Sequence, residues 1–173
     1  RNESIATTLN NIALVREGEP TAGFVHAPVL SRTWVGVVGR GAWAIQADGR
    51  RQPLKCDDAS VRGGPVRAVT SRSHLDPDTS AFLQGLRARG DEVESVPMGS
   101  SIKICLVAEG GADVYPRLGP TMHWDTAAAH AVVTAAGGVL VDPEGAPLRY
   151  RGPHRRNPSF VVCGAEGRAF WPA

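Results

Sequence analysis

Several features are scarce or absent in this 173-residue sequence, and each absence excludes a class of protein. Cysteine is scarce, since Cys56, Cys105 and Cys163 are an odd number without the spacing of a metal site. This excludes a disulfide framework and predicts reduced thiols, with Cys105 and Cys163 buried inside apolar runs. No apolar run reaches membrane-spanning length, and the first residues lack the pattern of a secretory signal. We therefore expect a soluble, cytoplasmic protein without a membrane span.

An excess of charge of one sign is also absent. The formal net charge is +2, from 19 Lys and Arg against 17 Asp and Glu. The basic residues are scattered except for Arg149, Arg151, Arg155 and Arg156, a cluster typical of a solvated loop face. The sequence therefore does not predict binding of a nucleic acid polymer. Internal repeats and low-complexity segments are absent too, and a hydrophobic content of 42% is enough for one good core.

Two patterns divide the chain, and together they predict a layered α/β (α+β) fold. Residues 1–56 read as antiparallel strands joined by tight turns, residues 57–64 as a polar linker, and residues 65–173 as alternating strands and helices with parallel pairing. The strands expected in the first half are 11–15, 21–27, 33–38, 41–46 and 52–55. In the second half we expect strands at 66–70, 93–96, 112–115, 138–141 and 160–163, and helices at 76–89, 102–109 and 126–136.

The segment 119–138 carries one acidic residue, Asp125, at the start of a helix made almost entirely of Ala, Val and Thr. Gly137 ends that helix, and the pattern places Asp125 at the N-cap. A plain cap would be sufficient reason for an Asp there. The turn at Gly119–Thr121 favours a second interpretation, because it brings backbone N–H groups and a hydroxyl to a helix terminus that attracts anions. Asp125 could then hold a metal ion or a substrate.

Further polar residues follow the ends of the expected strands, where ligands collect in such sheets. His74 follows the strand at 66–70, and Arg117 follows the strand at 112–115. Ser100, Ser101 and Lys103 follow the strand at 93–96 and offer N–H groups, hydroxyls and a cation to a phosphate monoester. Each has a plainer interpretation: a helix cap for Ser100, a solvated side chain for Lys103 and a loop hydrogen bond for His74. Together they indicate a site for a phosphorylated ligand and at least one cation.

These residues also resemble a known family. SRSH (71–74), MGSSIKICLVAEGGADVYPR (98–117) and GPTMHWDTAA (119–128) look like the C-terminal part of the CysQ-type 3′(2′),5′-bisphosphate nucleotidases of sulfur assimilation, in the Mg²⁺-dependent, Li⁺-inhibited inositol monophosphatase superfamily. NIALVREGEPTAGFVHAPVL (11–30) and GAW (41–43) are similar to the family's central antiparallel strands. The resemblance implies an inositol-monophosphatase-like αβαβα sandwich without its N-terminal helices. Ala129 departs from the family, where a Gly often follows the WDTAA string.

The resemblance also implies roles for individual residues. Asp125 matches an aspartate that binds a catalytic Mg²⁺ beside the scissile phosphate. Lys103 and Arg117, with Ser100, match contacts to the nucleotide and its other phosphate, and His74 matches a residue near the adenine and ribose. The expected substrate-binding set is His74, Ser100, Ser101, Lys103, Arg117 and Thr121. The implied reaction is hydrolysis of 3′-phosphoadenosine 5′-phosphate, a small-molecule phosphonucleotide, to AMP and phosphate.

One part of the family pattern is absent from the sequence. The family builds its metal site mainly from a helix-borne glutamate and a D-P-x-D-G-T element, both upstream of the strands found here. Asp76–Asp78 and Asp142–Gly145 are the only partial substitutes, and they read better as a helix start and a turn. A single carboxylate cannot assemble a metal site of two or three ions. We therefore expect this chain to be the C-terminal part of an enzyme, with an apolar sheet face exposed.

Other functions remain open from the sequence. An inositol-1-phosphate or fructose-1,6-bisphosphate phosphatase of the same superfamily would share most of these motifs. A non-catalytic phosphonucleotide-binding domain would keep Ser100, Lys103 and Arg117 without a metal centre. A structural subunit would pair with a partner that carries the missing acids, and a homodimer is also possible.

Overall fold

The computed structural model describes residues 8–57, 63–70, 76–98 and 102–165. Its first half is a five-stranded antiparallel sheet in the order β1-β2-β3-β4-β5, so the predicted meander is confirmed. The strands are β1 (Asn10–Arg16), β2 (Glu19–Ala27), β3 (Arg32–Val37), β4 (Gly41–Ile45) and β5 (Arg51–Leu54), with the short 3-10 turn η1 (Pro28–Leu30) after β2.

The second sheet is mixed, and the prediction of parallel pairing is right for only part of it. Its order is β10-β12-β8-β6-β7, with β6 parallel to β7 and β8, while β12 runs antiparallel to both β8 and β10. Antiparallel neighbours need no crossover helix, and the chain returns from β10 to β12 without one. The strands are β6 (Val66–Thr70), β7 (Val93–Pro97), β8 (Val114–Arg117), β10 (Gly138–Val141) and β12 (Phe160–Gly164). A further two-stranded sheet, β9 (Thr121–Met122) with β11 (Arg156–Asn157), was not predicted.

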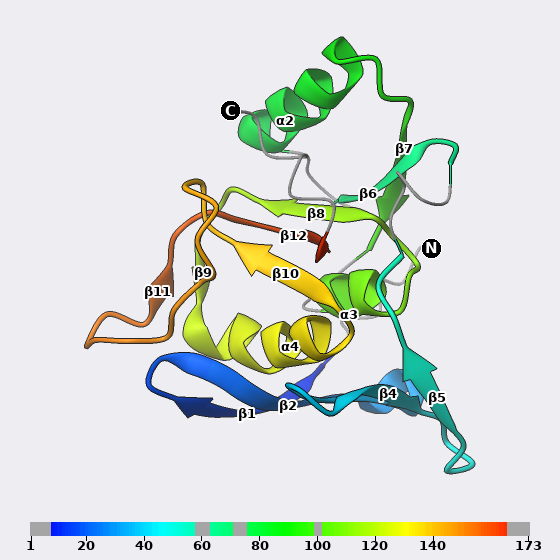
Figure 1. Ribbon diagram of the computed structural model, residues 1–173, viewed down its shortest axis with the longest axis vertical. Helices are drawn as coiled ribbons and strands as arrows, with labels where there is room; N and C mark the ends of the chain where they lie inside the picture. The colour runs from blue at the N-terminus through cyan, green and yellow to red at the C-terminus, as the bar shows by residue number, and fades with distance from the viewer. Residues whose placement is uncertain (1–7, 58–62, 71–75, 99–101, 166–173) are drawn as a thin grey trace, which may run out of the picture.

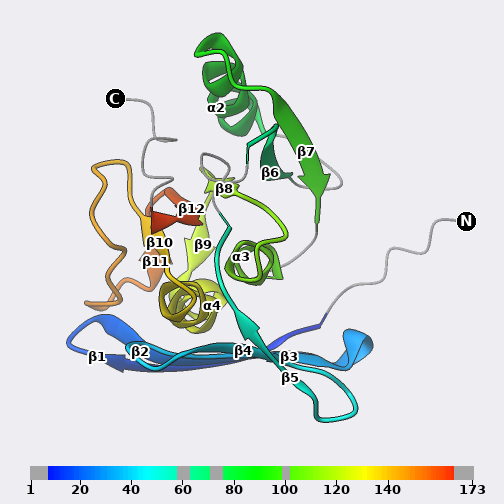
Figure 2. The same cartoon turned by 45° about the vertical axis from the view of Figure 1, so that its right-hand side comes forward.

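Within the described parts of the chain, three helices complete a four-layer arrangement. They are α2 (Pro77–Ala88), α3 (Ile102–Ala108) and α4 (His123–Ala135). Figures 1 and 2 show α3 and α4 between the two sheets, and α2 on the far side of the second sheet. The predicted start of α2 is confirmed, because Asp76 is its N-cap and accepts a hydrogen bond from the Thr79 backbone N–H at 2.8 Å.

Helix α4 lies unusually close to the antiparallel sheet. A Cβ atom built on Gly23 would stand 2.0 Å from the Ala128 carbonyl oxygen, and one on Gly36 would stand 2.5 Å from the Val132 Cα atom. Only glycine on the strands permits this approach, and small residues on α4 match it. The contact also joins the two halves that we predicted, because α4 belongs to 65–173 and the sheet to 1–56. Residues 58–62 of the expected linker lie outside the described residues, and the domain division stays a prediction.

The expectations about cysteines and the arginine cluster agree with the structure. Cys105 and Cys163 are buried, and all three cysteines are thiols. Burial raises the pKa of the Cys56 thiol to about 12 and also raises that of Cys105, so both are protonated and unreactive at neutral pH. The arginines of the cluster are all exposed: Arg149, Arg151, Arg155 and Arg156. No helix among the described residues is long and apolar enough to cross a bilayer.

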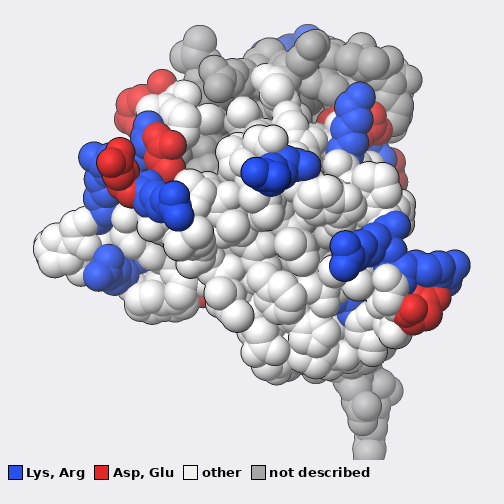
Figure 3. Space-filling view, turned by 60° about the horizontal axis from the view of Figure 1, so that its bottom comes forward, with Lys and Arg blue, Asp and Glu red and all other residues white. Residues whose placement is uncertain are grey.

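The outer face of the antiparallel sheet, opposite α4, is apolar and open. One cross-strand row on this face runs Ile12, Phe24, Val35, Trp43 and Pro53, from β1 to β5. Ile12 is 66% exposed and Phe24 is 37% exposed. Figure 3 brings this side of the molecule forward and shows a broad area without charged side chains, with Lys, Arg, Asp and Glu mainly toward its margins. Contiguous apolar surface of this kind marks an interaction surface or an association hazard.

We expect the chain to associate through this face as its concentration rises. Replacing Ile12 and Phe24 with Lys should shift the population toward monomer, because two charges would have to be buried in any sheet-to-sheet contact. Gln52→Lys, at an exposed position on β5, is the control that adds charge without altering the apolar row. Sedimentation velocity over a concentration series measures the effect. A monodisperse monomer in the unmodified chain would contradict the expectation.

Candidate active site

Four of the predicted site residues lie around one cavity of about 310 Å³ between the second sheet and the start of α4. They are Lys103 from α3, Arg117 from β8, Thr121 from β9 and Asp125 from α4. Ile104, Tyr115, Pro120, Thr126 and Phe160 complete the lining. The other three predicted residues, His74, Ser100 and Ser101, lie outside the described residues. Residues separated by up to 22 positions therefore converge on one cavity.

Lys103 is held in a desolvated position that sequence alone did not reveal. Its side chain is buried, with the residue only 6% exposed, so the alternative of a solvated lysine is wrong. The Nζ atom lies 5.3 Å from the centre of the Tyr115 ring, within range of a cation–π contact. Burial, followed by the charge of Arg117, lowers the pKa of Lys103, while Asp76 opposes that shift. An anion beside Lys103 would relieve both unfavourable effects.

Arg117 is the last residue of β8, whereas the sequence placed it after the end of this strand, because β8 spans Val114–Arg117 rather than 112–115. Its Nη2 atom donates to the Pro120 carbonyl oxygen at 3.1 Å, which orients the guanidinium across the turn before β9. The Nε atom is buried and has no hydrogen-bond partner among the described residues. A buried donor without a partner is costly, and an oxyanion is the natural acceptor for it.

Asp125 is not the N-cap of its helix, and this prediction is wrong. Helix α4 begins at His123, and its N-cap is Met122, which has an extended backbone. Asp125 occupies the third helical position, where its Oδ2 atom accepts the Met122 backbone N–H at 2.8 Å. The earlier start follows from β9, whose pairing with β11 ends at Met122 and leaves His123 to begin the helix. The Oδ1 atom has no hydrogen-bond partner among the described residues.

The described residues do not complete a metal site by themselves. Within the described ranges, no group of three or more His, Cys, Asp or Glu side chains is placed to hold a metal ion. Among the described residues that line the cavity, Asp125 is the single carboxylate. Mg²⁺ takes six oxygen ligands, and although several can be waters or phosphate oxygens, one carboxylate is a partial site. The two substitutes for the missing acidic motif are occupied elsewhere, since Asp76 caps α2 and Asp142 closes a turn with Gly145.

Sequence reasoning missed two residues that line the cavity, Tyr115 and Thr126, and two that hydrogen-bond to Thr126, Tyr150 and Asn157. Tyr115 forms part of its wall and carries a phenol whose pKa is raised to about 12 by burial, with Arg117 acting in the opposite direction. Thr126 follows Asp125 and receives hydrogen bonds from Asn157 and Tyr150. Asn157 and Tyr150 come from the segment between β10 and β12, and no motif in that segment signalled contact with α4.

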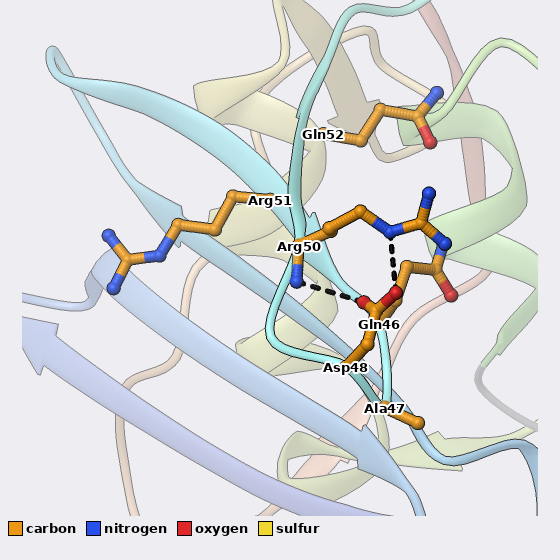
Figure 4. Close-up of a pocket in the computed structure, with 6 residues that line it drawn as sticks. All are labelled: Gln46, Ala47, Asp48, Arg50, Arg51 and Gln52. Atoms are coloured by element: carbon orange, nitrogen blue, oxygen red, sulfur yellow. Dashed lines mark hydrogen bonds and ion pairs between the residues drawn. The ribbon is translucent and has the colours of Figure 1, made fainter.

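A larger cavity, of about 510 Å³, lies at the tip of the β4–β5 hairpin. Figure 4 shows that all of its labelled side chains come from this one hairpin, and that Arg51 points away from Arg50. Arg50 is already bound to Asp48, with its Nε atom 2.5 Å from Oδ2 and its backbone N–H bonded to Oδ1. Both residues are exposed. This cavity brings together none of the predicted site residues and is a surface hollow, so the candidate site is the smaller one.

Comparison with known proteins agrees with this geometry. A model of the inositol monophosphatase family matches residues 7–165. The chain is 44% identical over 154 residues to the 3′(2′),5′-bisphosphate nucleotidase CysQ of Escherichia coli K12, covering 88% of this chain and 58% of that protein. It is 36% identical to the CysQ of Buchnera aphidicola, with 81% of this chain and 49% of that protein covered. The chain thus spans less than two thirds of the length of these relatives.

Solved structures give the same result for the fold. The crystal structure of CysQ from Bacteroides thetaiotaomicron, a bacterial member of the inositol monophosphatase family, superposes with a TM-score of 0.79 at 39% identity, over 89% of this chain and 61% of that one. The Staphylococcal IMPase-II structure gives a TM-score of 0.72 at 23% identity, over 93% of this chain and 62% of that one, which shows the fold alone. From the matched family model, the shared layered fold and the high identity to CysQ, the chain belongs to the inositol monophosphatase family.

Proposed function

We propose that this chain forms part of a metal-dependent 3′(2′),5′-bisphosphate nucleotidase that hydrolyses 3′-phosphoadenosine 5′-phosphate to AMP and phosphate. The observation that carries the proposal is the convergence of Lys103, Arg117 and Asp125 on one cavity of about 310 Å³. Two cations select a phosphorylated ligand, and the carboxylate provides a place for a cation beside it. The name of the CysQ relatives supports the choice of a bisphosphate nucleotide.

The two cations have different tasks in this proposal. Arg117 grips a non-scissile phosphate through parallel hydrogen bonds that include its buried Nε–H, for which no described residue is an acceptor. Lys103 acts as a point charge in a desolvated position, where attraction to an anion is stronger than in water. Thr121 adds a hydroxyl to the lining of the same cavity. His74, Ser100 and Ser101 are proposed to complete the contacts to the nucleotide.

Asp125 is proposed to hold a divalent cation, which we take to be Mg²⁺. A bound cation would neutralise phosphate charge and make a water molecule a better nucleophile at neutral pH. Asp125 contributes one ligand through an orientation that its hydrogen bond to the Met122 N–H already fixes. Since the described residues supply only this one carboxylate to the cavity, the remaining ligands would be water molecules, phosphate oxygens or groups outside the described residues.

Phosphate release from 3′-phosphoadenosine 5′-phosphate tests the proposal. It should be measured with and without Mg²⁺, for this chain and for the same chain extended through its upstream coding sequence. We expect Mg²⁺-dependent release from the extended form and little from the chain alone. Faster phosphate release from inositol 1-phosphate or fructose 1,6-bisphosphate would show that one of these is the substrate instead. If both the chain alone and the extended chain bind the nucleotide without turnover, the protein is a binding domain and the proposed enzyme activity is wrong.

Arg117→Lys should weaken binding of the bisphosphate nucleotide roughly tenfold to a hundredfold, because the lysine loses the paired hydrogen bonds while keeping the charge. It should affect an inositol monophosphate much less. Arg40→Lys is the matched control, since Arg40 is exposed in the turn between β3 and β4 and is not among the residues that line the cavity. Isothermal titration calorimetry gives both affinities. Equal losses for both ligands would place Arg117 on the scissile phosphate instead.

A further inference from the structure

The segment 148–157, which leads from β10 toward β12 and is called the strap here, lies along the first turn of α4. Its strand β11 pairs with β9, so that Arg156 faces Met122 and Asn157 faces Thr121. The Arg155 carbonyl oxygen also accepts the His123 backbone N–H at 2.7 Å. Figure 1 shows β11 beside β9 at the start of α4. The strap therefore supplies backbone partners to the residues immediately before Asp125.

The Asn157 side chain ties this turn together from inside. Asn157 is only 4% exposed, and its Nδ2 atom lies 3.0 Å from Thr121 Oγ1, 2.9 Å from the Met122 carbonyl oxygen and 2.9 Å from Thr126 Oγ1. A carbonyl can only accept, so the nitrogen end of the amide must face Met122. One amide group thus holds residues on both sides of Asp125, two of which line the cavity.

Tyr150, near the beginning of the strap, also contacts the Thr126 hydroxyl. Its phenol donates to Thr126 Oγ1 at 3.2 Å and lies 3.0 Å from the Nδ1 atom of His130. The phenol has one hydrogen, and when this hydrogen goes to Thr126, the Nδ1 atom of His130 is the donor to Tyr150. Burial lowers the pKa of His130 to about 4, so this histidine is neutral at pH 7. The Tyr150 ring also packs edge-on against His123, with ring centres 5.2 Å apart.

Packing alone does not hold the first turn of α4. From Thr126 to Val133 every helical residue is buried, and the close contact with Gly23 and Gly36 falls within this buried part. Trp124, in the first turn, is 61% exposed, and His123 and Asp125 are half-buried. The position of the Asp125 carboxylate therefore depends on hydrogen bonds to this turn rather than on burial.

We propose that Asn157 and Tyr150 are positioning residues, which hold Thr121, Met122 and Thr126 so that Asp125 faces the cavity. This inference rests on the proposed function for its catalytic consequence, but its structural content can be measured without substrate. Removing either strap side chain should loosen the segment from Thr121 to Asp125 while the buried part of α4 stays in place.

Two isosteric variants test the proposal in the full chain. Asn157→Asp keeps the shape but places a carboxylate oxygen against the Met122 carbonyl, and Tyr150→Phe removes one hydroxyl. Hydrogen exchange measured by NMR should become roughly tenfold faster or more at the Met122 and His123 amides in Asn157→Asp, and unchanged at Val132. Arg151→Ala is the control, because Arg151 belongs to the strap but donates to the Glu17 carbonyl oxygen instead of α4. Unchanged exchange in Asn157→Asp would overturn the proposal.

The imidazole of His130 gives an independent signature that a general loss of stability would not imitate. Its nitrogen chemical shifts should report the neutral form protonated at Nδ1 in the unmodified chain, and Tyr150→Phe should abolish that preference. A His130 protonated at Nε2 in the unmodified chain would contradict the hydrogen-bond order on which the role of Tyr150 depends.

Turnover in the extended chain separates this inference from the proposed function. Asn157→Asp should lower kcat for 3′-phosphoadenosine 5′-phosphate roughly tenfold or more, since small misplacements of a catalytic group are costly, and should change KM less because Lys103 and Arg117 are unaffected. If hydrogen exchange is faster in Asn157→Asp but the unmodified extended chain shows no turnover, the positioning role is supported and the proposed nucleotidase activity is contradicted. Normal turnover in Asn157→Asp would remove the positioning role alone.

Discussion

Gly23→Ala is expected to destabilise the chain by about 3 kcal/mol or more, at the upper end of what overpacking costs. The added Cβ would lie 2.0 Å from the Ala128 carbonyl oxygen and 3.0 Å from the Ala131 Cβ atom. Both belong to the buried part of α4, where a backbone carbonyl cannot rotate away as a flexible side chain would. Either the helix shifts off the sheet or the strand bends, and each response separates surfaces that are packed in the core.

Urea unfolding followed by circular dichroism measures this loss, and Gly85→Ala is its matched control. Gly85 lies on the exposed side of α2 and has no atom within 4 Å of a built Cβ, so alanine should stabilise by about 0.5–1 kcal/mol through helix propensity. The same substitution thus has opposite effects at two positions. A Gly23→Ala protein as stable as the unmodified chain would mean that α4 does not pack as closely as described.

The second large effect is expected at Asp113, whose replacement by Ala should lower the free energy of unfolding by roughly 3–5 kcal/mol. Asp113 is completely buried, and its carboxylate binds the Arg67 side chain through Oδ1 at 2.7 Å and Oδ2 at 3.2 Å. Oδ2 also accepts the Arg67 backbone N–H at 2.7 Å. The hydrogen bond to Asp113 is the main cause that raises the pKa of Arg67. Removing the carboxylate would leave most of that paired charge uncompensated beside the second sheet.

Asp48→Ala is the control for this prediction, because it removes an ion pair of similar length that is exposed. Arg50 and Asp48 are both on the surface, and exposed pairs of this kind contribute about 0–1 kcal/mol. Denaturant titrations should therefore show a loss in the free energy of unfolding that is several-fold larger for Asp113→Ala than for Asp48→Ala. If Asp113→Ala and Asp48→Ala both lower the free energy of unfolding by the same small amount, then Asp57 compensates for the missing partner of Arg67. Asp57 lies 3.0 Å from the Arg67 Nη2 atom.

Local sequence patterns determined a large part of the fold. Alternating apolar residues and the turn at Gly18 predicted the antiparallel meander, and Asp76 followed by Pro77 predicted the start of α2. Both depend on residues close together in the chain, for which propensity and capping are informative. The motifs around Lys103, Arg117 and Asp125 resemble those of a known family, and this resemblance indicated that the three side chains lie close together in the fold. They line one cavity, because proteins that share such motifs share the fold that brings them together.

Tertiary contacts decided the features that position the site. The third-position placement of Asp125 follows from β9 pairing with β11, whose residues lie about 35 positions away in the chain. The burial of Lys103 against Tyr115 and the contact of Asn157 with Thr126 also join residues that are not neighbours along the chain, and the second contact spans 31 positions. The mixed order of the second sheet depends on where β12 returns, between β8 and β10. Periodicity and capping rules describe neighbours along the chain, whereas these features arise from the free energy of bringing remote segments together, which no local pattern records.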